Sequence, residues 1–159
     1  MSTEQQVLAR AIWFDDECSN DFVDNAAAVG IVIDPFDSNT AGLAHLRNNY
    51  KHYDAVILDA WGRIKAGSDK AEDPEALGHA KDELHELAVK HGYTIPQCIY
   101  SGFMDKLEQV TGKAPKFNKR KQEDLDALFS WVIDQGERRG VTTIQSKHAD
   151  VFAVFDENL

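Results

Sequence analysis

Apolar and polar positions follow two different periods along the chain, and the changes between them predict the order of the structural elements. Short apolar, β-prone runs occur at residues 7–14, 31–34, 55–58, 95–100 and 114–118. Between these runs, apolar residues recur every three or four positions, the spacing of one helix face, at 20–29, 40–50, 74–91, 104–110 and 122–138. Strands that alternate with helices predict an α/β fold whose parallel sheet carries helices on both faces.

Proline and glycine mark where we expect two of these elements to end. Pro35 is expected to stop the second strand, and Gly140 to close the last helix. A short β-prone segment begins at Val141, and apolar residues farther along suggest one or two more helical turns. We therefore expect a domain at residues 1–140 and an extension at 141–159, which packs on that domain or links it to a further region.

Residues with chemical potential stand at the ends of four of the predicted strands. Asp15 and Asp16 follow the first strand, Asp59 the third, Ser101 the fourth and Lys119 the fifth. In open parallel sheets, the carboxyl ends of the strands and the loops that follow them line the crevice where ligands bind. We expect these side chains to form a single site.

The residue types at these strand ends suit the acceptance of a phosphoryl group. Carboxylates are hard oxygen ligands, and Mg²⁺ binds one or two of them while it keeps several waters. An aspartate can also act as the nucleophile that takes the phosphoryl group. The transfer further requires positive charge and a hydrogen-bond donor, which Lys119 and Ser101 provide.

Composition narrows the classes of partner. The chain has 159 residues, the size of one domain, and its formal net charge of −10 disfavours nucleic acid and anionic membranes. It contains no apolar run of the roughly 20 residues needed to span a bilayer and no signal-peptide pattern, so we expect a cytoplasmic protein. Cys18 and Cys98 lack metal-finger spacing and are expected to be reduced thiols, with Cys98 in the core.

Four short motifs fall at the ends of the predicted strands: WFDDE at 13–17, AVILDA at 55–60, IYSG at 99–102 and FNKR at 117–120. With these motifs in this order, residues 7–138 resemble the receiver domain of two-component response regulators. The resemblance implies a flavodoxin-like, three-layer α/β/α sandwich with a five-stranded parallel sheet in the order 2-1-3-4-5.

The resemblance also implies a role for each residue of the expected site. Asp59 would be the phosphoacceptor, Ser101 the switch hydroxyl, and Lys119 the residue that pairs with the phosphoryl group. Mg²⁺ would be held by Asp15, Asp16, Asp59 and the backbone carbonyl of Trp61. The implied partners are a histidine kinase or phosphotransfer protein as donor and a downstream protein as target, with a homodimer as a further arrangement. Such a domain is not an enzyme beyond assisting its own phosphorylation and dephosphorylation.

The sequence departs from the family pattern near the fifth strand and after Asp59. Arg120 stands where family members usually have proline, and Lys116 where they usually have an aromatic residue. Phe117, one position along, is expected to face the other way. The loop at 60–73 is long for a connection between a strand and a helix.

These departures leave two alternatives open. The first is a receiver-like docking module that is never phosphorylated. The second is a small Mg²⁺-dependent phosphohydrolase, although such enzymes generally use an Asp-x-Asp pair and Asp59 is followed by Ala60 and Trp61.

Overall fold

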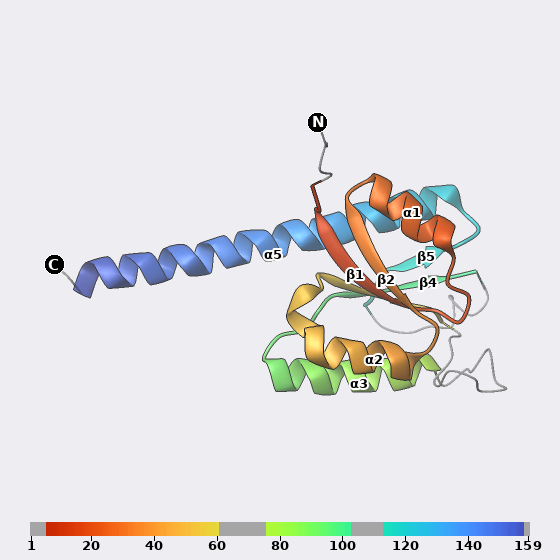
Figure 1. Ribbon diagram of the computed structural model, residues 1–159, viewed down its shortest axis with the longest axis horizontal. Helices are drawn as coiled ribbons and strands as arrows, with labels where there is room; N and C mark the ends of the chain where they lie inside the picture. The colour runs from red at the N-terminus through yellow and green to blue at the C-terminus, as the bar shows by residue number, and fades with distance from the viewer. Residues whose placement is uncertain (1–5, 61–75, 103–112, 158–159) are drawn as a thin grey trace.

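The computed structural model describes residues 6–60, 76–102 and 113–157, with side chains up to Gly140. Its centre is a five-stranded parallel sheet in the order β2-β1-β3-β4-β5 (Figure 1). The strands are β1 (Ala9–Phe14), β2 (Ile31–Phe36), β3 (Ala55–Leu58), β4 (Gln97–Ser101) and β5 (Lys116–Asn118). The predicted fold class and strand order are confirmed.

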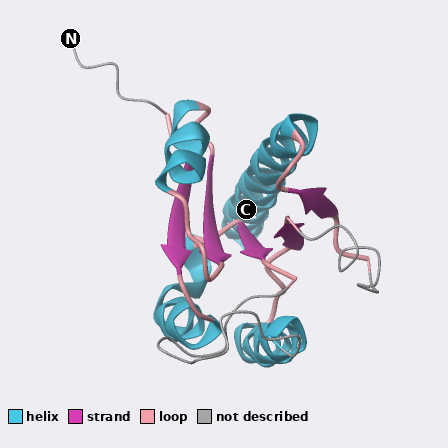
Figure 2. Ribbon diagram, turned by 90° about the vertical axis from the view of Figure 1, so that its right-hand side faces the viewer, coloured by secondary structure: helices cyan, strands magenta, loops and turns pink. Residues whose placement is uncertain are grey.

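Helices lie on both faces of the sheet (Figure 2). One face is covered by α1 (Asn20–Ala28) and α5 (Gln122–Glu157), and the other by α2 (Asn39–Asn49) and α3 (Ala76–His91). A short 3₁₀ helix, η1 (Tyr50–His52), follows α2. The helix expected at 104–110 and most of the loop at 60–73 lie outside the described residues.

Each face of the sheet has its own apolar core because successive side chains of a strand point to opposite faces. In β1, Ala11 and Trp13 pack with α1 and α5, whereas Ile12 and Phe14 pack with α2 and α3. All four residues of β3 are at most 1% exposed, so its continuous apolar run reflects burial on both sides. This central strand carries Asp59 at its end.

The expected end of the second strand at Pro35 is wrong. β2 continues through Pro35 to Phe36, and Pro35 lies opposite Trp13 in the parallel register with β1. Proline cannot donate a backbone hydrogen bond, but β2 is an edge strand with a neighbour on one side only. An edge position therefore accommodates the proline within the strand.

The expected end of the last helix at Gly140 is also wrong. α5 continues to Glu157 through the segment expected to be β-prone, and its second half projects away from the sheet (Figure 1). Among the described glycines only Gly30 and Gly92 have positive φ, so Gly140 does not adopt the left-handed conformation that ends many helices. A glycine inside a helix costs about 1 kcal/mol relative to alanine, yet it keeps its backbone hydrogen bond. Despite its length, α5 is not apolar enough to cross a membrane, nor is any other helix in the described ranges.

Candidate metal and phosphoryl site at the carboxyl edge of the sheet

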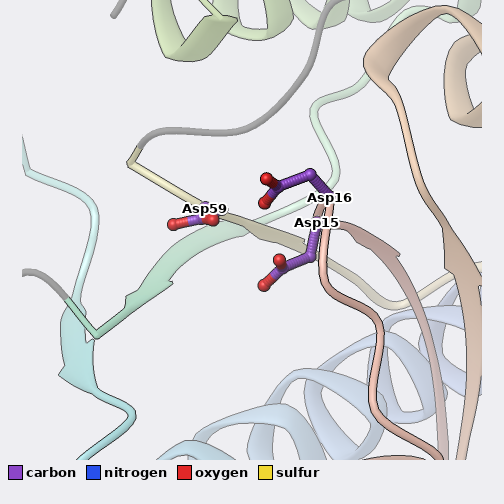
Figure 3. Close-up of side chains that lie close together, drawn as sticks. All are labelled: Asp15, Asp16 and Asp59. Carbon is purple, nitrogen blue, oxygen red and sulfur yellow. The ribbon is translucent and has the colours of Figure 1, made fainter. Parts of the chain in front are cut away.

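Three aspartates meet where β1 and β3 end side by side. Asp15 and Asp16 directly follow β1, Asp59 directly follows β3, and the two strands are paired up to Phe14 and Leu58. One carboxylate oxygen from each aspartate lies within 4.8 Å of those of the other two. Figure 3 shows the three side chains gathered over these strand ends. The parallel register therefore brings together acids that are more than forty positions apart in the sequence.

Backbone hydrogen bonds hold two of these acids beyond the ends of their strands. The N–H of Asp15 donates to the carbonyl of Phe36 at 3.0 Å, and the N–H of Asp59 donates to the carbonyl of Phe14 at 3.2 Å. The N–H of Glu17 donates to Asp15 Oδ1 at 2.9 Å. The backbone on both sides of the acid cluster is thus tied to the sheet.

The acid cluster concentrates negative charge in a poorly hydrated place. Asp15 is 1% exposed and Asp59 6% exposed. Asp16 is half-buried, and burial raises its pKa to about 6, with further contributions from the negative charges of Asp15, Asp59 and Glu17. Buried carboxylates are costly unless a cation is close by, so this site favours positive charge.

Lys119 supplies positive charge to the cluster from the turn after β5. Its ammonium group donates a hydrogen bond to Asp15 Oδ2, and its Nζ lies 3.9 Å from Asp59 Oδ2. Burial by itself lowers the pKa of Lys119, but the charges of Asp15 and Asp59 outweigh that effect and leave the pKa raised. Lys119 is therefore charged, and it stands between two of the acids.

Ser101 lies at the same edge of the sheet. It is the last residue of β4, which pairs with β3, and it is fully buried. Its carbonyl accepts a hydrogen bond from the N–H of Lys119 at 3.0 Å, which joins the ends of β4 and β5. The structure thus gathers five of the six residues expected at the site, while Trp61 lies outside the described residues.

The three aspartates fit a divalent cation of the Mg²⁺ type by their chemistry. All three offer hard oxygen ligands, and their oxygens are close together. Burial first, and then the negative charges of Asp15, Asp59 and Glu17, raise the pKa of Asp16, and a bound cation would offset both effects. Coordination of one or two carboxylates leaves positions for water and for a phosphate oxygen. The metal role of these residues stays a prediction.

Two neighbours of the site were not expected from the sequence. The ring of Tyr100 lies beneath Lys119, with the Nζ 5.6 Å from the ring centroid, and its only signal is its place directly before Ser101. The thiol of Cys18 donates to the carbonyl of Asp15 at 3.1 Å. Burial, followed by the charge of Asp15, raises the pKa of Cys18 to about 12, so this cysteine is a protonated thiol at neutral pH. Cys98 is fully buried in the core, as expected.

Neighbouring side chains of β5 point to opposite faces, as expected for a strand. Phe117 is buried in the core beneath α1 and α5, whereas Lys116 is exposed. The aromatic residue that family members place at the position of Lys116 therefore has no counterpart on that side of β5.

Several solved structures that share this fold are receiver domains. A signal receiver domain from Vibrio parahaemolyticus matches with a TM-score of 0.57 and 13% identity, over 86% of this chain and 95% of that one. A response regulator receiver domain protein from Clostridium thermocellum matches with a TM-score of 0.53 and 19% identity, over 84% and 98%. A CheY-like receiver domain from Methylobacillus flagellatus matches with a TM-score of 0.53 and 18% identity, over 78% of this chain and 98% of that one. No protein-family model matches the sequence, and the search of curated proteins found no significant match.

Proposed function

We propose that this domain is a phosphoacceptor of a two-component or phosphorelay system and that it is phosphorylated on Asp59. The observation that carries the proposal is the convergence of Asp15, Asp16, Asp59 and Lys119 at the carboxyl edge of the sheet, with Ser101 beside them. The fold that holds these residues is that of response regulator receiver domains. Fold and residue chemistry support the same function.

In the proposed reaction, a carboxylate oxygen of Asp59 attacks the phosphorus of a phosphohistidine or of a small acyl phosphate. The new bond joins Asp59 Oδ to phosphorus, while the bond from phosphorus to the donor breaks and the donor leaves with its electron pair. Bound Mg²⁺ supplies positive charge to the phosphoryl oxygens. Asp15 and Asp16 would hold this ion together with Asp59 and the carbonyl of Trp61.

The remaining site residues respond to the new charge on Asp59. Lys119 already lies 3.9 Å from Asp59, so a small movement brings its ammonium group to the phosphoryl oxygens. The Ser101 hydroxyl is a second donor at the end of the neighbouring strand. These changes at the ends of β4 and β5 alter a surface that a downstream protein contacts. The phosphoryl group comes from a histidine kinase or phosphotransfer protein.

The second half of α5 supports a linking role for the chain after residue 140. It projects from the sheet as a continuous helix rather than folding back on it (Figure 1). We propose that residues 1–140 carry the phosphoacceptor function and that residues 141–159 link it to a further region or partner.

A docking module that is never phosphorylated is the second candidate, favoured by one observation. Lys116 is exposed and Phe117 is buried, so β5 lacks the aromatic residue through which the family usually couples phosphorylation to its surface. Such a module would keep the fold and the acid cluster without accepting phosphate.

The test is incubation with acetyl phosphate and Mg²⁺, followed by intact-mass measurement. Wild type should gain the mass of one phosphoryl group, and Asp59→Asn should gain none. Asp37→Asn is the matched control because Asp37 is an exposed acid that follows β2 at the same edge of the sheet. Wild type without a mass gain and without Mg²⁺ affinity indicates the docking module, whereas steady release of phosphate from many phosphoesters indicates a hydrolase.

A further inference from the structure

Tyr100 places an aromatic ring directly below the charged group of Lys119. The ring is 6% exposed and lies on the face of the sheet covered by α1 and α5. The Nζ of Lys119 is 5.6 Å from the ring centroid, within the range at which an ammonium group is attracted to an aromatic face. Tyr100 therefore contacts the cation that stands between Asp15 and Asp59.

The same ring continues into a stack that ends in α1. Tyr100 stacks on Phe22 of α1, with ring centroids 5.0 Å apart and planes 23° apart. Phe22 in turn lies against Trp13 of β1, with centroids 4.5 Å apart. Only the ring of Tyr100 therefore lies between the ammonium group of Lys119 and Phe22 of α1 along this stack.

A hollow of about 260 Å³ beside this stack leaves room for the ring to move. It opens between α1, the loop before it, and the start of α5. Its lining includes Phe22, Tyr100, Lys119 and Leu125. The helices therefore do not close completely over the ring and the lysine.

β5 offers no alternative ring at this position. Phe117 is directed into the core, where its ring centroid lies 6.5 Å from that of Trp131. Within the described part of the chain, the ring that contacts Lys119 belongs to Tyr100, on β4.

We propose that Tyr100 is a positioning residue that holds Lys119 between Asp15 and Asp59. When Lys119 changes its partner, Tyr100 transmits the movement of the lysine through Phe22 to α1. The inference rests on the proposed phosphorylation of Asp59. When Lys119 turns from Asp15 to the phosphoryl group, its ammonium group shifts over the ring, and the ring shifts against Phe22. The surface of α1 then differs between the two states.

Three variants separate this role from simple core packing. Tyr100→Phe keeps the ring, Tyr100→Leu removes it, and Phe129→Leu removes a different ring that also packs on Phe22, with centroids 5.6 Å apart. Labelling by acetyl phosphate and Mg²⁺, followed by intact mass, should be roughly three- to tenfold slower for Tyr100→Leu. It should stay within about twofold of wild type for the other two variants, because neither loses the ring beneath Lys119.

NMR spectra give a second measurement, the shift of individual amide signals, which a role of Tyr100 in core packing alone would not predict. Beryllium trifluoride with Mg²⁺, which imitates the phosphoryl group, should shift the amide signals of Ser101, Lys119 and Phe22 in wild type. In Tyr100→Leu the Phe22 shift should disappear while the other two remain.

The outcomes separate the inference from the function on which it rests. Wild type that takes no phosphoryl group overturns both. Wild type that is labelled but shows no shift at Phe22 overturns the inference alone, and so does a Tyr100→Leu variant that matches wild type in labelling rate and in the Phe22 shift. If Tyr100→Leu does not fold, the wild-type Phe22 signal still decides the question: a shift supports the inference, and no shift overturns it.

Discussion

Lys119 donates its ammonium hydrogen bond to Asp15, although the two residues are 104 positions apart in the sequence. The Asp15 side chain is fully buried and that of Lys119 is 25% exposed, so the ion pair lies mostly away from water. It provides the positive charge that two buried carboxylates require. A cation bound by the aspartates would share this task and free Lys119 for another partner.

Loss of this lysine should destabilise the fold when no metal is bound. Lys119→Met removes the positive charge that lies beside Asp15 and Asp59, and we expect the free energy of unfolding to fall by about 2–3 kcal/mol. Lys116→Met is the matched control because Lys116 is an exposed lysine of the same segment, and its loss should cost less than about 0.5 kcal/mol. Urea denaturation without Mg²⁺ measures the loss of unfolding free energy in both variants.

Mg²⁺ should restore part of the stability that Lys119→Met loses. A cation that binds the folded state stabilises it by mass action, and the variant has the greater deficit of positive charge. No gain in either protein would contradict a cation site at these carboxylates, and an equal gain in both would show that Mg²⁺ does not replace the charge of Lys119.

The raised pKa of Asp16 predicts how stability depends on pH. Burial and the neighbouring acids raise this pKa to about 6, so between about pH 4 and pH 6 the folded state holds a proton that the unfolded state has released. The contribution of Asp16 is therefore least favourable above pH 6, and stability should increase as the pH falls from 7 to 5 without metal. Asp16 is partly exposed, so screening by solvent limits the effect to about 1 kcal/mol.

Asp16→Asn isolates this contribution from those of the histidines. The variant should be more stable than wild type at pH 7, and the difference should shrink toward pH 5. Thermal denaturation of both proteins across this range, in the presence of a chelator, measures it. A difference that grows as the pH falls would show that Asp16 is not under electrostatic strain.

Two glycines of α5 should respond in opposite ways to alanine. A Cβ at Gly136 would lie 2.4 Å from the carbonyl oxygen of Leu8 and 2.9 Å from the Cβ of Ala9, so Gly136→Ala should destabilise the fold by about 1–3 kcal/mol. A Cβ at Gly140 meets no atom within 4 Å among the described residues, and Gly140→Ala should stabilise the helix by up to about 1 kcal/mol. Chemical denaturation compares them, and a loss of stability in Gly140→Ala would contradict a continuous helix at this point.

Arg139 should matter more than its neighbour Arg138. Its guanidinium donates hydrogen bonds that tie α5 to the chain before β3: to the carbonyl of Tyr53 at 2.7 Å, to the Asp54 carboxylate at 3.2 Å and to the carbonyl of Lys51. Arg139→Ala should cost about 1–3 kcal/mol of unfolding free energy. The Arg138 side chain is 74% exposed and pairs with Asp134 on the same helix, so Arg138→Ala should cost less than about 0.5 kcal/mol. Equal losses in the two variants would mean that α5 is not held at Arg139.

The order of elements and the place where the three aspartates meet could be predicted from the sequence because both depend on local pattern. The run from Ala55 to Leu58 is apolar because β3 is buried on both faces, and the residue after it must then lie at an edge of the sheet. The same reasoning brings Asp15 and Asp16 to that edge from β1.

The features that could not be predicted depend on contacts between distant elements. Pro35 fits within β2 because β2 is an edge strand. The resemblance to receiver domains already implies that edge position, but the expectation for Pro35 rests on the residues around it alone. Gly140 is helical because α5 is already formed on the sheet before it, although the same residue often ends helices. The pairing of Lys119 with Asp15, and the ring of Tyr100 beneath it, follow from side-chain directions that sequence spacing does not specify.

The measurement that tests the central claim most directly locates the phosphoryl group on the chain. Borohydride reduces an aspartyl phosphate to homoserine, which tandem mass spectrometry identifies by position after proteolysis. After treatment with acetyl phosphate and Mg²⁺, we predict homoserine at position 59 and unmodified aspartate at positions 15 and 16. Homoserine at 15 or 16, or at none of the three, would contradict the assignment of Asp59 as the phosphoacceptor.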